Sequence, residues 1–155
     1  TEIVQKMRSN FDTKTEQLKP AFTASKKKIS DIITMASIIE KETDNETDRG
    51  IVSGILWKRI YIDMPMQVDA AFAYYLDKSS KELTQSDLKT DSTYNTYIHR
   101  GLPKGPISNP GLASIKAALF PVKSDYLYYL NGRDGKTRYA ENLEEHKKKR
   151  AKYLD

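Results

Sequence analysis

A stripe of apolar residues at helical spacing in the first third of the chain constrains the fold more than any other feature. Its members are Ile29, Ile32, Ile33, Ala36 and Ile39. This spacing places them on one face of a helix, which must bury that face against another element. We therefore expect a helix at residues 29–42, capped by Ser30, and after a polar break a second amphipathic helix that begins at Asp48.

The remaining patterns predict an α+β domain that is mostly helical, with a small antiparallel β-sheet and a late β-hairpin. Residues 2–18 have the spacing of an amphipathic helix that ends before Pro20. Apolar and polar residues alternate over 64–69, which is typical of an extended segment that presents Gln67 and Asp69 on one face. We expect this segment to join a sheet with the hairpin predicted around the turn residues 131–135.

The stretch from Thr93 to Gly111 holds three prolines and three glycines and predicts a long, ordered loop. Its residues Asn95, Thr96 and Tyr97 bring together an amide, a hydroxyl and a phenol, which suits hydrogen bonding and stacking on a sugar. The competing interpretation is a structural loop that covers one edge of the core. Asn109 followed by a proline predicts the start of the next helix. Asn142, three residues before a glutamate, predicts a capping box for a last, basic helix.

Composition excludes several classes of chemistry. The 155 residues contain no cysteine, which removes thiol nucleophiles, disulfides and thiolate zinc sites. No apolar run is long enough to span a membrane. The net charge is +5, and the acidic residues gather at 31–70 between basic flanks, which are compatible with attraction to an anionic polymer or simply with solvated helix faces. The length fits one domain.

No metal site is predicted. The alternating acids at residues 44–48 resemble the start of a calcium-binding loop, but Arg49 stands where that loop needs glycine and Ile55 where it needs glutamate. The two histidines, His99 and His146, lie far apart in the sequence without ligand-like neighbours.

Glu40 continues the apolar stripe of the helix predicted at 29–42. With Ile33 at zero and about 100° per residue, Glu40 lies at about −20° on a helical wheel and Glu42 at about 180°. A carboxyl in line with apolar residues is partly desolvated, which raises its pKa toward the range that a general acid needs near neutral pH. We therefore predict Glu40 as the candidate acid and expect Glu42 to point into water. The alternative is that Glu40 is a rim residue whose carboxylate reaches solvent.

Four motifs follow one another along the chain. They are Ala-Ser-Ile-Ile-Glu-Lys-Glu-Thr at 36–43, Met-Pro-Met-Gln-Val-Asp at 64–69, Tyr-Asn-Thr-Tyr at 94–97 and Gly-Leu-Pro-Lys-Gly-Pro-Ile-Ser-Asn-Pro-Gly at 101–111. In this order and spacing they resemble the catalytic domain of the YceG-like endolytic murein transglycosylases, over nearly the whole chain. The sequence departs from the family pattern at Val68 and Ala70, where Thr and Pro are usual, and at Lys104, which replaces a common proline.

The resemblance implies an enzyme, a lytic transglycosylase. It would cleave the β-1,4 bond between N-acetylmuramic acid and N-acetylglucosamine inside peptidoglycan strands and leave 1,6-anhydromuramic ends. It makes Glu40 the catalytic glutamate, acting first as general acid and then as base. The substrate-binding residues that it implies are Gln67, Asp69, Asn95, Thr96, Tyr97, Gly101, Leu102, Pro103, Ile107 and Asn109. It implies neither a metal nor an organic cofactor.

The same resemblance implies a domain organisation and a location. Residues 1–155 are expected to be a fragment with a leading helix and linker at 1–28 and a catalytic core at 29–155. Family members typically carry an N-terminal membrane anchor and a LysM-like region, which do not occur in these residues. We expect the full-length protein on the extracytoplasmic face of the bacterial cytoplasmic membrane, held there only by such an anchor. Its expected partners are peptidoglycan glycan strands and cell-wall synthesis proteins, not nucleic acid.

A second class of function stays open from the residues themselves. The basic flanks and the polar loop also fit a noncatalytic module that binds a glycan or an anionic polymer. Binding with steep salt dependence and no bond cleavage would distinguish that module from an enzyme.

Overall fold

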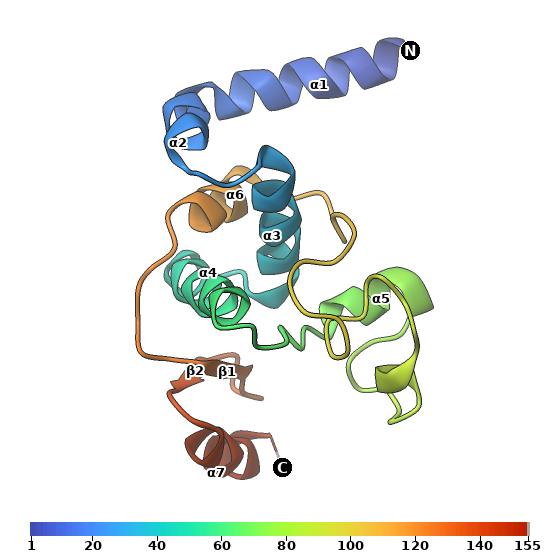
Figure 1. Ribbon diagram of the computed structural model, residues 1–155, viewed down its shortest axis with the longest axis vertical. Coiled ribbons are helices and arrows are strands. Elements are labelled where there is room, and N and C mark those ends of the chain that lie inside the picture. Colours follow the sequence, from blue (N-terminus) through green and yellow to red (C-terminus); the bar gives the residue numbers. More distant parts are fainter. Residues whose placement is uncertain (155) are drawn as a thin grey trace.

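The computed structural model describes residues 1–154 and confirms the α+β prediction: the chain is mostly helical, with a small antiparallel sheet between α4 and α7 (Figure 1). The elements in chain order are α1 (Glu2–Thr15), η1 (Glu16–Leu18), α2 (Lys19–Ala24), α3 (Ile29–Glu42), α4 (Glu46–Tyr61), α5 (Ala70–Leu76), η2 (Asp87–Lys89), α6 (Leu112–Leu119), β1 (Tyr128–Asn131), β2 (Thr137–Ala140) and α7 (Leu143–Tyr153). The labels η1 and η2 denote short 3-10 turns.

Helix α3 forms the centre of the core and packs against α4 and α6 (Figure 1). The apolar stripe predicted from the sequence is mostly buried, but so is much of the opposite face. Fully buried side chains on α3 are Ile32, Met35, Ala36, Ser37, Ile38 and Ile39. Burial on nearly all sides is the main source of stability for such a helix, at about 1.5–3 kcal/mol for each large apolar side chain.

The bounds predicted for α3 are confirmed, whereas its predicted cap and the predicted start of the next helix need correction. Ser30 lies inside α3 and bonds the side chain of Asp31 instead of capping the helix. Helix α4 begins two residues before Asp48, because the side-chain oxygen of Asn45 accepts a hydrogen bond from the Asp48 amide at 3.1 Å. Asparagine is among the preferred N-cap residues, so the earlier start is favourable.

The chain segment after α6 crosses α4 closely, and two glycines make this crossing possible. The Val122 amide donates to the Gly50 carbonyl at 3.0 Å. A Cβ at Gly54 would lie 1.9 Å from the carbonyl oxygen of Val122, so no other residue fits there without moving the backbone. This crossing carries the chain from α6 toward the hairpin and thereby fixes where β1 begins.

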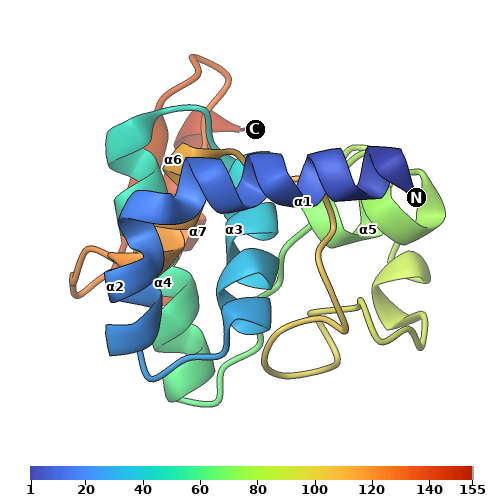
Figure 2. The same ribbon diagram turned by 90° about the horizontal axis from the view of Figure 1, so that it is seen from above.

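The first helix ends before Pro20 as predicted, but its α-helical part stops at Thr15 and a second helix follows at once. The helical path continues through η1 into α2, where Pro20 occupies the first turn. Proline is tolerated there because the first amides of a helix have no intrahelical partner. Helix α1 extends away from the top of the molecule (Figures 1 and 2), and its residues Ile3, Val4 and Met7 are exposed.

The sheet contains only β1 and β2, paired antiparallel from Tyr128 opposite Ala140 to Asn131 opposite Thr137. The late hairpin is therefore confirmed, but the expectation that residues 64–69 join the sheet is wrong. Gln67 has a φ of 54°, which interrupts an extended strand. The backbone of this segment bonds Thr96 instead: the Gln67 amide donates to the Thr96 carbonyl at 3.0 Å. The expected alternation holds, with Met66 and Val68 buried and Gln67 exposed.

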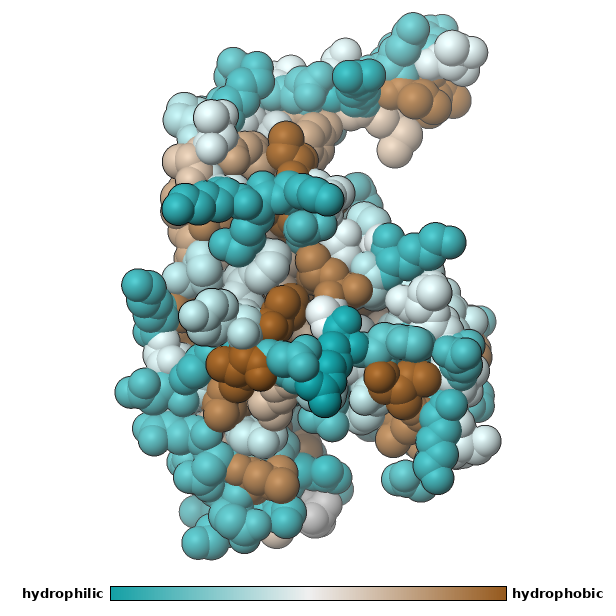
Figure 3. Space-filling view, viewed as in Figure 1, coloured by the Kyte–Doolittle hydropathy of each residue, from teal (hydrophilic) through white to brown (hydrophobic). Residues whose placement is uncertain are grey.

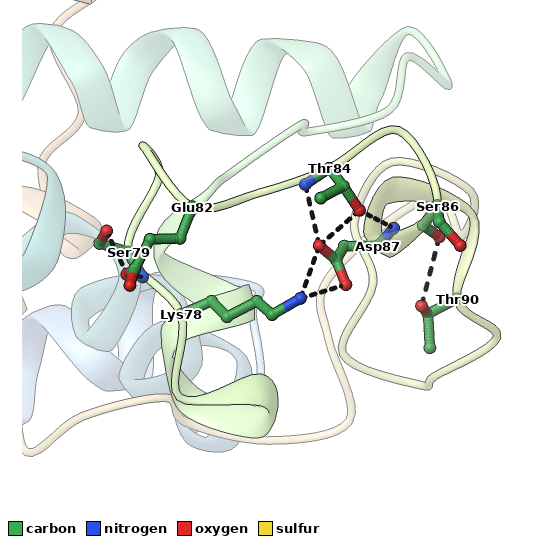
Figure 4. A network of polar contacts seen from close by, with 7 residues as sticks. All are labelled: Lys78, Ser79, Glu82, Thr84, Ser86, Asp87 and Thr90. Atoms are coloured by element: carbon green, nitrogen blue, oxygen red, sulfur yellow. Dashed lines mark hydrogen bonds and ion pairs between the residues drawn. The ribbon is translucent and has the colours of Figure 1, made fainter.

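A polar network shapes the loop between α5 and the 93–111 loop (Figure 4). Asp87 accepts from the Lys78 ammonium at 2.7 and 2.8 Å and from the Thr84 amide at 2.8 Å. These bonds lower the pKa of Asp87 to about 2, with the Lys78 bond as the largest cause. The carboxylate thus stays charged and holds the turn at Thr84.

The starts of the last two helices differ in how well the sequence predicts them. Helix α6 begins at Leu112 with Gly111 as its N-cap residue, so Asn109 lies before the helix and does not cap it. Helix α7 begins as predicted, because the Asn142 side chain accepts from the Glu145 amide at 2.9 Å.

Candidate active site

A large cavity lies at the carboxyl end of α3, between the loop after α5 on one side and β1 with α7 on the other. Its volume is about 1280 Å³, and Figure 3 shows a hollow between the two lower lobes of the molecule. Polar and aromatic lining residues include Glu42, Arg59, Gln67, Asp69, Tyr74, Tyr97, Tyr128, Tyr129, His146 and Arg150. A cavity of this size with a few convergent polar groups is the usual form of a ligand site.

Glu42 is the acidic residue of α3 that lines this cavity. Its Oε2 accepts a hydrogen bond from the Tyr129 hydroxyl at 2.8 Å, and its backbone carbonyl accepts from the Asn131 side chain at 2.8 Å. The pKa of Glu42 is raised to about 7: burial of the carboxyl is the largest cause, the negative charge of Asp69 adds to the rise, and the Tyr129 bond and Arg59 oppose it. Glu42 is therefore protonated in part of the molecules at neutral pH, which corrects the expectation that it points into water.

Asp69 and Tyr97 form the second polar pair of the cavity. The Tyr97 hydroxyl donates to Oδ1 of Asp69, and the ring of Tyr97 packs edge-on against Phe72 at 5.6 Å. Burial, followed by the bond to Asp69, raises the pKa of the Tyr97 phenol, so the phenol stays a donor at neutral pH. The pair holds one carboxylate oxygen in place.

Arg59 of α4 ties the cavity wall together. Its side chain is only 5% exposed. Nε donates to the Leu127 carbonyl at 2.7 Å and Nη1 donates to the Met66 carbonyl at 2.6 Å. These bonds join the segment that carries Gln67 and Asp69 to the start of β1. A buried guanidinium with charge-assisted bonds of this length is a strong positional constraint.

Glu40 lies elsewhere, on the face of α3 that contacts α6. Its Oε2 accepts from the Gly111 amide at 3.0 Å and from the Ser114 hydroxyl at 2.6 Å. The Ser114 bond lowers the pKa of Glu40 more than burial raises it. The expectation that the pKa of Glu40 is raised is thus wrong, because its Oε2 accepts hydrogen bonds from donors at the start of α6. The role of Glu40 as an acid stays a prediction from resemblance.

Asn95 and Thr96 do not lie on the cavity surface, in contrast to the expectation that they contact a sugar. Asn95 is fully buried and its amide donates to the Leu88 and Thr90 carbonyls at 3.0 and 2.8 Å. Thr96 is 1% exposed, and its hydroxyl accepts from the Val68 amide at 2.9 Å. Their polar atoms are used to hold the loop and to fix Gln67 and Asp69, so Tyr97 alone of this motif reaches the cavity.

Of the predicted residues in the following stretch, Ile107 lines the cavity. Its amide donates to the Ser37 hydroxyl at 3.0 Å, which docks the loop on α3. Gly101, Leu102, Pro103 and Asn109 do not line it. Gly101 has a φ of 80°, and Pro103 is buried. These residues shape the loop that positions Ile107.

The sequence did contain a signal for Glu42. Ile38 and Met35 precede it by four and seven residues, the same helical spacing that aligns Glu40 with Ala36 and Ile33. Both faces of α3 therefore carry an apolar row that ends in a glutamate. Nothing local to the sequence predicts that Tyr129 or Arg59, which come from distant elements, meet at the end of one of these rows.

Two further properties concern the part of the chain that the structure describes. Within residues 1–154 no three His, Asp or Glu side chains gather closely enough to hold a metal ion. No helix within the same residues is both long enough and apolar enough to cross a membrane.

Comparison with known proteins gives consistent relatives. The YceG-like family model matches residues 1–152. An endolytic murein transglycosylase of Bacillus subtilis is 35% identical over 99% of this chain and 42% of its own length. One of Streptococcus pneumoniae is 32% identical over 90% of this chain and 27% of its own. A crystal structure of a YceG-like protein of Listeria monocytogenes is 41% identical, with a TM-score of 0.87 over 95% of this chain and 48% of that chain. The chain thus spans less than half the length of these relatives.

Proposed function

This chain belongs to the YceG-like family, and we propose that it cleaves the glycan strands of peptidoglycan internally, as a lytic transglycosylase. The relatives from Bacillus and Streptococcus are named for this activity. The observation that carries the proposal is the half-buried carboxyl of Glu42, with its pKa near 7, in a large cavity that Gln67, Asp69 and Tyr97 also line.

Glu42 is the proton donor in this proposal. A carboxyl with a pKa near the working pH is available both as an acid and, after donation, as a base. The Glu42 proton goes to the glycosidic oxygen, and the bond between that oxygen and C1 of the muramic sugar breaks. The Glu42 carboxylate then takes the proton from the C6 hydroxyl of the same sugar while O6 bonds to C1. The products are a free hydroxyl and a 1,6-anhydro ring, and no water is consumed.

Asp69 and Tyr97 support the charge that develops on the sugar ring. Bond cleavage leaves positive charge at C1 and the ring oxygen, and a fixed carboxylate stabilises such charge in a site shielded from water. Tyr97 fixes Asp69 through its hydroxyl, so little reorganisation is needed during the reaction. Gln67, exposed at a positive φ, offers its amide to the sugar hydroxyls.

The remaining expectations are part of the same proposal. We propose that residues 29–155 form the catalytic core and that residues 1–28 form a leading helix and linker. We propose that the protein acts on the extracytoplasmic face of the cytoplasmic membrane, because its proposed substrate lies there, and that proteins of cell-wall synthesis are partners. No nucleic acid or cofactor takes part.

The products of digestion test the proposal directly. Purified peptidoglycan is incubated with the protein, and the muramic ends are analysed by mass spectrometry. We expect ends lighter by one water than the ends that a hydrolase leaves. Hydrolytic ends would contradict the transglycosylase step and implicate Asp69 in activating water. Salt-sensitive binding without any cleavage would instead support a noncatalytic module.

A further inference from the structure

One wall of the cavity carries two arginines that form no ion pair with a carboxylate of residues 1–154. This cationic wall consists of Arg59, Tyr128, His146 and Arg150, all of which line the cavity. The Arg59 guanidinium lies over the Tyr128 ring at 5.0 Å, and the His146 ring stacks on the same Tyr128 ring at 5.1 Å. Among residues 1–154, neither Arg59 nor Arg150 has a carboxylate within ion-pair distance.

Arg59 has a hydrogen-bond donor to spare. Backbone carbonyls take Nε and Nη1, and within the described residues Nη2 donates to no protein atom. Nη2 is not among the fully enclosed polar atoms either, so it faces the cavity. A guanidinium that is 5% exposed and forms no close ion pair within the described residues is costly, and a ligand that brings a negative charge reduces that cost.

His146 and Arg150 extend this wall along α7. Nδ1 of His146 is buried without a hydrogen-bond partner. Burial is the largest cause that lowers the pKa of His146, and the positive charges of Arg150 and Arg59 lower it further. The acids Glu42 and Asp69 also line the cavity, with Asp69 held by Tyr97. The cavity therefore has an acidic part and a cationic part.

We propose that the cationic wall is a subsite for a free carboxylate of the peptide that branches from the muramic sugar. This inference rests on the proposed function. In a peptide-bearing strand the lactyl carboxyl of muramic acid is an amide, so the anionic groups belong to the peptide. A glycan that lies over Glu42 and Asp69 would direct such a peptide toward the walls of the cavity. Arginine suits this ligand because its planar guanidinium bonds a carboxylate with two donors.

Two muramyl dipeptides that differ by one carboxylate test the subsite. They are N-acetylmuramyl-L-alanyl-D-glutamate and N-acetylmuramyl-L-alanyl-D-isoglutamine, in which the α-carboxyl of the glutamate is an amide. Affinities for the wild-type chain, Arg150→Gln and Lys148→Gln are measured by calorimetry or by NMR titration. Lys148 is the matched control, because it lies on α7, is exposed and does not line the cavity.

We expect the wild-type chain to bind the acid about tenfold more tightly than the amide, which corresponds to about 1.4 kcal/mol. Arg150→Gln should reduce that ratio to about threefold or less, and Lys148→Gln should leave it unchanged. Equal affinities in the wild-type chain, no binding of either compound, or an equal loss in Lys148→Gln would overturn the subsite. Because the ratio is read without bond cleavage, an inactive protein that keeps the ratio would contradict the proposed function alone.

Discussion

Two glutamates two residues apart on α3 have opposite environments. Oε2 of Glu40 is bonded by an amide and a hydroxyl of the α6 region, and its pKa is lowered. Glu42 is enclosed beside Asp69 with one phenol as donor, and its pKa is raised to about 7. The difference shows that the acid–base character of a carboxyl depends on which donors the tertiary structure brings to it, more than on the apolar neighbours along its own helix.

The largest expected effect separates the two residues by rate. Glu42→Gln removes the proposed proton donor and should lower the rate of peptidoglycan cleavage by about 10²–10⁴-fold. Glu40→Gln keeps an acceptor for Gly111 and Ser114, so we expect less than about a tenfold loss. Release of soluble fragments from purified peptidoglycan measures both, with circular dichroism as the control for folding. If Glu40→Gln abolishes cleavage and Glu42→Gln does not, Glu40 is the proton donor, as the family resemblance implies, and Glu42 is not.

Stability should change with opposite sign in the same two variants. The folded state holds the Glu42 proton up to about pH 7, whereas the unfolded chain releases it near 4.5, so stability falls as pH rises between these values. Glu42→Gln removes that loss and should be more stable than wild type at pH 8, by up to about 3 kcal/mol, and about equal at pH 4.

Glu40 contributes the reverse. Its folded pKa is lowered, so its contribution is present above its ordinary pKa and is lost as pH falls. Glu40→Gln should therefore be less stable than wild type at pH 8, by about 1 kcal/mol. Urea unfolding of both variants at pH 4 and pH 8 measures the two signs. A destabilised Glu42→Gln at pH 8 would show that its carboxyl is well solvated.

A smaller effect is expected when the one donor to the Glu42 carboxyl is removed. The Tyr129 bond lowers the pKa of Glu42, so Tyr129→Phe should raise it. Cleavage requires the protonated acid, and its decline on the alkaline side should move to higher pH. The pH profile of the rate measures this shift. The hydroxyl of Tyr97 bonds Asp69 instead, so Tyr97→Phe serves as a comparison that should move the profile less.

The smallest expected effect concerns the other glutamate. Ser114→Ala removes the bond that most lowers the pKa of Glu40, at a cost to stability of about 1 kcal/mol. The pH profile of cleavage should stay unchanged, since Glu40 takes no proton-transfer role in this account. A profile that shifts in Ser114→Ala would point back to Glu40.

The helical core and the hairpin follow from the sequence because their signals are local. The period of 3.6 predicts α3, and turn residues predict the reversal between β1 and β2. Residues 64–69 are the counterexample: they alternate as in a strand, yet a positive φ at Gln67 and bonds to Thr96 keep them out of the sheet. Those bonds come from a loop almost thirty residues away, which no local pattern contains.

The candidate site was predictable only in part. Motifs identified Gln67, Asp69 and Tyr97, all of which line the cavity. A single helical wheel describes α3 as a surface helix with one apolar face. It therefore predicts that the Glu42 side chain points into water. The helix is central and packed on both faces, a property that depends on α4, α6 and the hairpin.

A carbon-13 NMR titration of the glutamate carboxyls, assigned with Glu40→Gln and Glu42→Gln, tests the contrast directly in one sample. We predict that the Glu42 carboxyl titrates near pH 7 and that the Glu40 carboxyl titrates below the ordinary value of 4.5. The opposite order, or an ordinary pKa for Glu42, would contradict the assignment of the proton donor.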